Sequence, residues 1–218
     1  MIKTGKRLKK LTVNTEDKQA YAATKDAIMG LNAEVMPDDD QQLWLSFRGG
    51  DHDAYNVLVR KHANLLFSYG CKFSKDEDFI KDCIQDVFFE LWNRREKISQ
   101  AASVKAYLFK SLRLRIFREQ SKWNNSDSFE DTFLFKDEFN IESHLIQEQT
   151  TKEISAKLQT MLTSLTERQK EILYLHFFED VDQDGIGRIM GLNKQSVYNL
   201  LYRSITTLRK KAEFINFF

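Results

Sequence analysis

Residues 71–184 contain neither glycine nor proline, and few folds tolerate so long a stretch without them. Tight hairpins between β-strands depend on glycine and proline, so the absence of both from this stretch argues against a sheet of short strands. The whole chain of 218 residues has eight glycines and a single proline, Pro37. Its hydrophobic share of 42% suffices for one large or two small globular domains. We therefore predict an all-α protein.

A pattern typical of three successive helices occupies residues 165–211. The first helix should begin with a capping box, because Thr166 is followed three residues later by Gln169. Apolar side chains at positions 172–177 then give that helix a broad buried face.

The second and third helices of this pattern are joined by a short turn. The second helix should start near Asp182 or Asp184, Gly191 supplies the turn, and Asn193 is a good N-cap for the third helix. The apolar face of the third helix should comprise Val197, Leu200, Leu201, Ile205 and Leu208. This arrangement predicts a helix-turn-helix.

The third helix is strongly basic on its polar side. Residues 194–211 include five basic residues and no acidic residue, a charge of +5. The face opposite the apolar one presents Lys194, Gln195, Ser196, Tyr198, Asn199 and Arg203. A helix fits the major groove, where its side chains reach base edges and its cations neutralise phosphates. We predict DNA binding through this face; a three-helix bundle with a solvated basic face is the alternative.

The chain divides into four parts. Residues 1–37 are polar and basic at the start, and we interpret them as an N-terminal extension. Residues 38–122 have strong helical periodicity and should form the first domain, and residues 155–218 contain the helix-turn-helix domain. An acidic linker, residues 123–154, joins two small helical domains.

The linker differs in character from its neighbours. Residues 126–153 carry eight acidic and two basic side chains, a charge of −6. Four phenylalanines interrupt the acidic stretch, namely Phe129, Phe133, Phe135 and Phe139. Such charge should keep the linker away from DNA, and simple solvation of a linker is the alternative interpretation.

Residues 76–97 should form one long helix. Apolar doublets recur every four residues and predict a wide buried stripe, and Ser74 with Glu77 suggests a capping box at its start. The doublets are Phe79 with Ile80, Cys83 with Ile84, Val87 with Phe88, and Leu91 with Trp92. The polar residues outside the stripe are Asp82, Gln85, Asp86, Glu90 and Asn93, which taken alone are typical of a solvated face.

Residues 82–92 resemble the helix with which bacterial RNA polymerase sigma factors grip the clamp helices of the largest polymerase subunit. Residues 41–70 resemble the opening helices of sigma region 2, and the helix-turn-helix segment resembles sigma region 4. The short two-domain layout is similar to the extracytoplasmic-function (ECF) group. By this resemblance, core polymerase binding would involve Asp82, Gln85, Asp86, Phe88 and Trp92.

Residues 103–122 should complete the first domain as a basic helix. They carry six basic residues and one acidic residue, a charge of +5. One inward-facing face should be formed by Val104, Tyr107, Leu108, Ser111, Leu112, Arg115 and Ile116. The cations expected to contact a separated DNA strand are Lys105, Lys110, Arg113 and Arg118. In the family this helix and the loop before it recognise and open the promoter element nearest the start site; a solvated basic face is the alternative.

The chain departs from the family pattern at four positions. Leu114 and Arg118 stand where members often have Asn and Asp, so the family's base preference does not carry over. Gly185 and Gly187 stand where Glu and Ala are usual, and two glycines cost a helix about 1–2 kcal/mol. We expect the same fold with a softer second helix.

Catalysis and metal binding find little support in the sequence. The four histidines are scattered, and no HExxH, phosphate-loop or GxSxG motif is present. Cys71 and Cys83 do not form a metal-ligating cluster, and we expect both to be reduced thiols. We predict no enzymatic activity, no catalytic residue, no metal and no cofactor. No apolar run approaches membrane-spanning length, so we expect a cytoplasmic protein without direct membrane insertion.

Together these features predict a transcription initiation factor of the ECF type. It would bind core RNA polymerase, place region 4 on upstream duplex, and let region 2 capture the opened promoter DNA. The resemblance also implies an anti-sigma factor as regulator. One alternative is a helix-turn-helix regulator that does not join RNA polymerase, and another is an interaction protein that holds an anti-sigma partner without initiating transcription.

Overall fold

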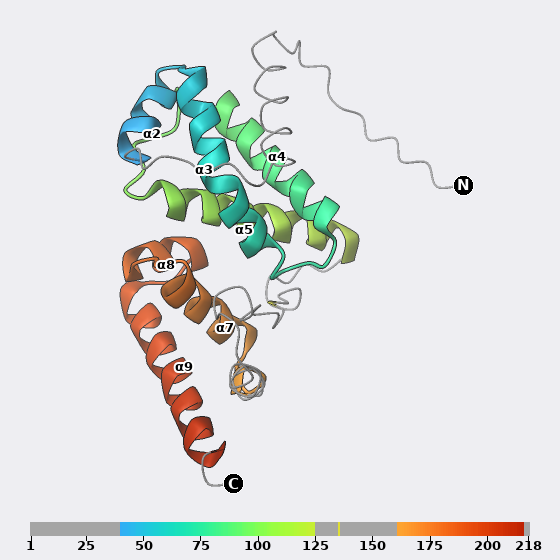
Figure 1. Cartoon of the computed structure of the whole chain (residues 1–218), viewed down its shortest axis with the longest axis vertical. Coiled ribbons are helices and arrows are strands. Elements are labelled where there is room, and N and C mark those ends of the chain that lie inside the picture. Colours follow the sequence, from blue (N-terminus) through green and yellow to red (C-terminus); the bar gives the residue numbers. More distant parts are fainter. Residues whose placement is uncertain (1–39, 125–134, 136–160, 216–218) are drawn as a thin grey trace, which may run out of the picture. The chain divides into compact units, whose positions relative to one another are not determined.

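The computed structural model describes residues 40–124, 135 and 161–215, and every regular element in these ranges is a helix (Figure 1). The predicted all-α fold class is confirmed. The N-terminal extension and almost all of the acidic linker lie outside the described residues. Within the described helices we find none whose length and hydropathy would suit a membrane span.

Two compact units make up the chain. Of the described residues, 40–64 and 85–100 form the first unit, and 65–84, 101–124, 135 and 161–215 form the second. Two helices of the N-terminal half therefore contribute one end to each unit. The predicted boundaries of the two domains stay a prediction.

The first unit begins with α2 (Asp40–Arg48), and α3 (His52–Gly70) follows after a sharp turn. Gly50 adopts a φ of 92°, a left-handed conformation that favours glycine. The Asp51 carboxylate accepts hydrogen bonds from two backbone N–H groups at the start of α3. The turn at Gly50 and the cap at Asp51 therefore separate α2 from α3.

Aromatic side chains dominate the core of the first unit. Trp44, Phe47, Tyr55, Phe88 and Trp92 are all at most 1% exposed. The Tyr55 hydroxyl donates to the backbone carbonyl of Phe88 at 3.2 Å, and the rings of Tyr55 and Trp92 lie 5.0 Å apart. These contacts tie α3 to α4 (Glu77–Asn93). The capping box predicted for α4 is wrong: the carboxylate of Asp76 accepts from the Phe79 N–H at 3.0 Å and caps the helix instead.

Helix α5 (Val104–Asn124) belongs to the second unit and buries two faces rather than one. The first face was predicted, and its most buried residues are Val104, Leu108, Leu112 and Ile116. The second face consists of Ala106, Phe109, Arg113 and Phe117, each at most 7% exposed. An α5 buried on both of these sides has less free surface for DNA than the sequence suggested.

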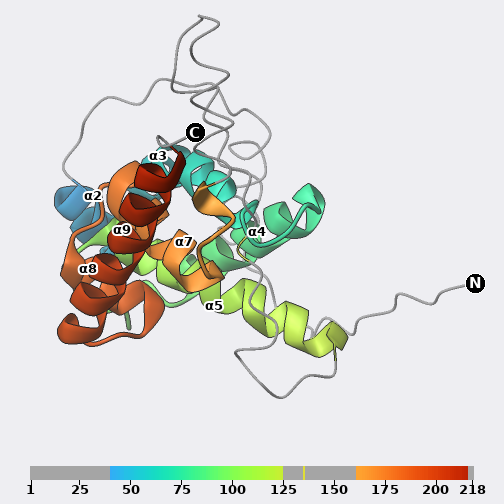
Figure 2. The ribbon, with the colours of Figure 1, turned by 90° about the horizontal axis from the view of Figure 1, so that it is seen from below.

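The C-terminal part of the second unit follows the predicted order of helices. It contains α7 (Glu167–Leu173), the π-helix η2 (Tyr174–Phe178), α8 (Gln183–Met190) and α9 (Lys194–Ile215). Both α7 and α8 pack on α9, as Figures 1 and 2 show. The predicted helix-turn-helix is therefore present.

Local signals at the ends of these helices were predicted correctly. Thr166 and Gln169 form the predicted capping box of α7, and α8 starts next to Asp182 as predicted, with the Asp182 side chain as its N-cap. Gly191 ends α8 with a φ of 67°, and the Asn193 side chain accepts from the Ser196 N–H at 2.8 Å. One apolar position was wrong. Ile205 is 38% exposed, and the neighbouring Ser204 is buried instead, with its hydroxyl donating to the Leu200 carbonyl.

Candidate nucleic-acid and polymerase interface

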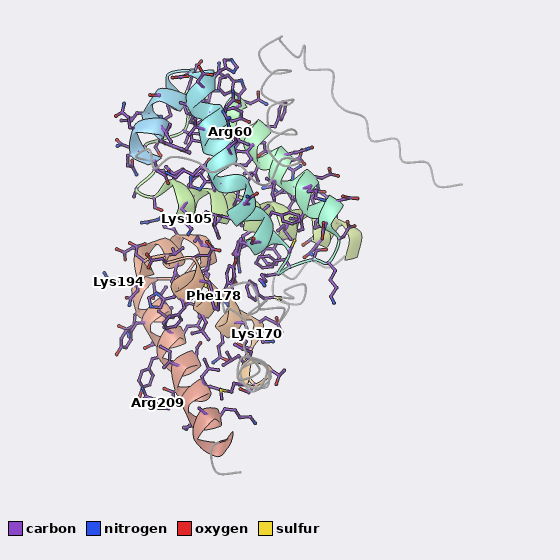
Figure 3. The ribbon with its side chains drawn as sticks, in the orientation of Figure 1. Arg60, Lys105, Lys170, Phe178, Lys194 and Arg209 are labelled. Atoms are coloured by element: carbon purple, nitrogen blue, oxygen red, sulfur yellow. The ribbon has the colours of Figure 1, made fainter. Side chains whose placement is uncertain are left out.

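The polar face of α9 is open to solvent. Lys194, Gln195, Tyr198, Asn199 and Arg203 are exposed, whereas Ser196 is half-buried. Lys194 points away from the ribbon in Figure 3, its side chain is 76% exposed, and its nearest acidic partner, Asp184, lies 3.6 Å away. All six predicted residues of this helix thus share one face, with five fully accessible.

Tyr202 was not among the predicted contacts, although it lies on the same face. Its side chain is 64% exposed and that of Tyr198 is 55% exposed. The two rings stack at 6.5 Å between centroids with an interplanar angle of 14°. The sequence did contain a signal for this pair: Tyr198 and Tyr202 are four residues apart, which places them on the same face of a helix.

The four predicted cations of α5 fall into two groups. Lys110 and Arg118 are exposed. Lys105 and Arg113 are instead bound to carboxylates of the C-terminal helices. Only the first two offer an uncovered charge to a DNA phosphate in this structure.

Arg113 is 7% exposed and lies in a buried ion pair. Its Nε is 2.8 Å from Oε1 of Glu171, and its second contact joins Nη2 to Oε2 at 3.4 Å. The Tyr69 hydroxyl donates to the same Oε1 at 2.6 Å. Burial and the Glu171 carboxylate hold the pKa of Tyr69 well above its ordinary value, so the phenol keeps its proton. Burial alone would lower the pKa of Arg113, but Glu171 and Tyr69 more than offset this and raise it.

Lys105 is held by Glu179 at the end of η2. Its Nζ lies 2.9 Å from Oε2 of Glu179 and also donates to the backbone carbonyl of the same residue. The Tyr174 hydroxyl donates to Oε1 of Glu179 at 2.8 Å. Burial, followed by the charge of Glu179, raises the pKa of Tyr174. Glu179 is only 6% exposed, and both of its carboxylate oxygens therefore have a partner, one in Lys105 and the other in Tyr174.

Comparison with known families decides the identity. The description "Sigma-70 region 2" matches residues 58–123, and "Sigma-70, region 4" matches residues 155–208. The chain belongs to the sigma-70 family of RNA polymerase sigma factors. These are the two regions that the sequence predicted, in the predicted order, and the expectation of an ECF sigma factor is confirmed.

Individual sigma factors are similar over most of their length. The RNA polymerase sigma factor SigV of Bacillus subtilis (strain 168) is 25% identical over 156 residues, which cover 70% of this chain and 87% of the relative. The solved structure of CnrH in complex with the cytosolic domain of CnrY has a TM-score of 0.55 and 19% identity. It covers 81% of this sigma factor and 98% of that chain, and this likeness concerns the fold.

The predicted polymerase-binding residues on α4 differ in accessibility. Asp82 is exposed, and Gln85 and Asp86 are half-buried. Phe88 and Trp92 are 0% and 1% exposed, because both belong to the aromatic core. A direct contact with polymerase suits the three polar residues, whereas the two aromatic ones hold the helix in place.

Steric contacts explain why glycine occupies positions 185 and 187 of region 4. A Cβ at Gly187 would lie 2.8 Å from the backbone oxygen of Leu192, which is too close. A Cβ at Gly185 would lie 2.6 Å from Oδ1 of Asp182 and 3.5 Å from the Cβ of Ala106 on α5. The tight contacts at position 185 are therefore with the side chains of Asp182 and Val181 at the start of α8, whereas Ala106 lies at an ordinary van der Waals distance.

Metal-ligating geometry is absent from the part of the chain that the structure describes. No group of three or more His, Cys, Asp or Glu side chains in residues 40–124 and 161–215 is placed to hold an ion. Both cysteines are free thiols, and burial raises the pKa of Cys71.

Proposed function

We propose that this sigma factor initiates transcription by carrying core RNA polymerase to promoters and stabilising their opened form. The single observation that carries the proposal is the pairing of a region 2 match with an acid-free, exposed recognition face on α9. The exposed face of α9 alone would not distinguish a sigma factor from another DNA-binding protein, and the region 2 match supplies that distinction. No catalytic residue takes part, and binding energy drives each step. We place these events in the cytoplasm.

Core polymerase binding is assigned to the polar side of α4. Asp82 and Asp86 are four residues apart and therefore lie on one face of the helix. Two carboxylates on an exposed or half-exposed face suit a basic partner surface. Gln85 lies between them and supplies an amide to the same surface.

We assign binding of the promoter duplex to α9. Lys194 and Arg203 supply positive charge, and Tyr198 and Asn199 supply groups that reach base edges or thymine methyl groups. Lys194 lies in the first turn of α9, where we propose a phosphate contact, and Arg203 lies further along, where we propose a base edge.

We assign binding of the opened promoter strand to α5. Lys110 and Arg118 are exposed there, and flipped bases must gain contacts that offset a few kcal/mol of lost pairing and stacking. Leu114, 37% exposed, replaces the polar residue common in the family at that position. Base preference should therefore differ from the family norm.

A protein regulator completes the proposal. The similar structure contains CnrH in complex with the cytosolic domain of CnrY. We propose that an anti-sigma factor likewise binds this chain and controls its access to polymerase.

In vitro transcription with purified core polymerase on a genomic fragment library, with mapped start sites, tests the function. Wild-type protein should give a small set of start sites that share an upstream element. Asp86→Arg should weaken core binding by several kcal/mol with unchanged helical content. Glu96→Arg makes the same charge change at an exposed residue beyond α4 and should leave core binding intact. Specific DNA binding without core binding would favour the regulator that acts apart from polymerase.

A further inference from the structure

Four exposed, uncharged side chains occupy the middle of the polar face of α9, and we call them the neutral patch. Their spacing of i, i+3, i+4 and i+7 places them on one side of the helix. The side chains are those of Gln195, Tyr198, Asn199 and Tyr202. Uncharged groups do not neutralise phosphates, so their exposure in the centre of a basic helix favours contacts with base edges.

Two members of the neutral patch are already bonded to each other. Nε2 of Gln195 donates a hydrogen bond to Oδ1 of Asn199 at 3.0 Å. Because each amide group has an oxygen acceptor and N–H donors, the bonded pair still offers Oε1 of Gln195 as an acceptor and Nδ2 of Asn199 as a donor. An exchange of roles between the two amides would leave the same set. The pair therefore presents one acceptor beside one donor at an exposed site.

This set of groups matches adenine in the major groove. Adenine presents the N7 acceptor beside the N6 amino donor, whereas guanine presents two acceptors, cytosine a donor, and thymine an acceptor with a methyl group. The N6 amino group of adenine would donate to Oε1 of Gln195, and N7 would accept from Nδ2 of Asn199. Guanine would instead place its O6 acceptor against the Gln195 oxygen. The amide pair therefore selects adenine over guanine.

The two tyrosines form a second pair beside the amides. Their rings stack with centroids 6.5 Å apart and an interplanar angle of 14°. Tyr198 nevertheless stays 55% exposed and Tyr202 64% exposed. Contact with an apolar group would remove this ring surface from water, which is favourable. The apolar group that base pairs present in the major groove is the methyl group of thymine, the partner of adenine.

We propose that the neutral patch reads A·T base pairs of the upstream promoter element. The Gln195–Asn199 pair contacts adenine, and the Tyr198–Tyr202 pair contacts thymine methyl groups. This inference rests on the proposed function, because it names the bases that the duplex contact of α9 selects.

Charge complementarity supports duplex DNA as the occupant of this face. Residues 194–211 carry a charge of +5 and no acidic residue, so the cations around the neutral patch attract phosphates. Phosphate contacts hold a helix in the groove, and base contacts provide the specificity. The hydrogen bond between the amides and the stacking of the rings order these side chains before binding, which reduces the entropy lost on binding.

The first test uses holoenzyme and the upstream element of a promoter found by start-site mapping. Each adenine in turn is replaced by an analogue with C–H in place of N7, which still pairs with thymine. At the adenine read by the amide pair, wild-type binding should weaken by about fivefold. Asn199→Ala should bind the natural duplex more weakly and lose nothing further with the analogue. Gln42→Ala removes an exposed amide of α2 and should keep the full analogue loss.

The second test replaces each thymine of the same element with deoxyuridine, which removes only the methyl group. Wild-type binding should weaken by about fourfold at the thymine that the rings contact. Tyr198→Ala with Tyr202→Ala should abolish this loss, whereas Tyr198→Phe with Tyr202→Phe keeps both rings and should retain it. Leu45→Ala, at a 44% exposed apolar residue of α2, is the matched control and should also retain it.

The inference requires both losses. An upstream element without an A·T pair overturns it, and so does the absence of a loss with either analogue. Losses that are equal in wild type and the patch variants also overturn it, because the bases would then be read elsewhere or through duplex shape. Weaker core polymerase binding by the tyrosine-to-alanine variant, with an unchanged deoxyuridine loss, would assign the rings to a protein partner instead. Holoenzyme that protects no upstream duplex contradicts the proposed function itself, and the inference falls with it.

Discussion

Helices α5 and α9 carry the two sets of basic residues predicted to contact DNA, yet their surroundings differ. On α9, Lys194 and Arg203 stand in solvent on an open face. On α5, Arg113 is buried against Glu171 and Lys105 is held by Glu179. Equal charge in the sequence therefore corresponds to unequal availability in the folded chain. The acidic partners determine which cations are ready to bind DNA.

The difference follows from the position of each cation on its helix. Arg113 falls four residues after Phe109 and four before Phe117, so it lies within a buried stripe. A buried arginine must be paired, and Glu171 supplies the charge. Arg203 lies on the side of α9 opposite Val197 and Leu201, where no such requirement exists.

The largest expected effect compares two arginines. Arg113→Ala should lower the free energy of unfolding by about 3–5 kcal/mol, because Glu171 would be left buried without its partner. Arg203→Ala, an exposed change on α9, should stay within about 0.5 kcal/mol. Urea unfolding followed by circular dichroism measures both. Similar small losses for the two variants would show that Arg113 is not paired in solution.

A smaller effect is expected in DNA affinity. Arg203→Ala should weaken binding of the holoenzyme to its upstream duplex by about 1–3 kcal/mol and relax preference at one base pair. Lys194→Ala should weaken binding to all sequences and reduce the salt slope by about one. Arg60→Ala removes an exposed cation from α3 and serves as the control. Footprints over a salt series that are identical for wild type, Lys194→Ala and Arg203→Ala would refute the placement of α9.

The smallest effect concerns an ion pair that lies outside α5 and α9. It gives a scale against which the two larger effects can be compared. His62, with Nε2 at 3.4 Å, and Lys61, with Nζ at 2.7 Å, lower the pKa of Asp40 to about 2. A depressed carboxyl pKa stabilises the fold above the unfolded value near 3.8, and this stability is lost as the pH falls toward 2. Because the Asp40 side chain is only half-buried, with 29% of its surface exposed, solvent screening reduces the contribution to about 1 kcal/mol. Asp40→Asn should lose that amount at pH 7 and show less change in stability between pH 4 and 2.

Features set by neighbouring residues were predictable from the sequence. The capping box of α7, the turn at Gly191 and the N-cap at Asn193 each depend on residues within four positions, and the structure contains all of them. The helical periodicity also gave the first buried face of α5. Local chemistry of this kind does not require knowledge of the tertiary fold.

Features set by distant residues were not predictable. Glu171 is 58 positions from Arg113 and 102 from Tyr69, and no periodicity relates them. The helix pattern placed Phe88 and Trp92 in the buried stripe of α4, but it did not show that both rings pack in the aromatic core with Tyr55 of α3. Gly185 was interpreted as a loss of helix stability, and no sequence pattern indicated that it would be buried beside Ala106 of α5.

The central claim is that α9 binds upstream duplex while α5 acts on separated strands. Holoenzyme footprinting combined with permanganate oxidation of unpaired thymines, at a promoter found by start-site mapping, measures both activities on one DNA. Arg203→Ala should lose upstream protection and, with it, opening. Lys110→Ala with Arg118→Ala should keep upstream protection but lose most permanganate reactivity. Full reactivity in the α5 variant, or loss of upstream protection equal to that of Arg203→Ala, would contradict the account.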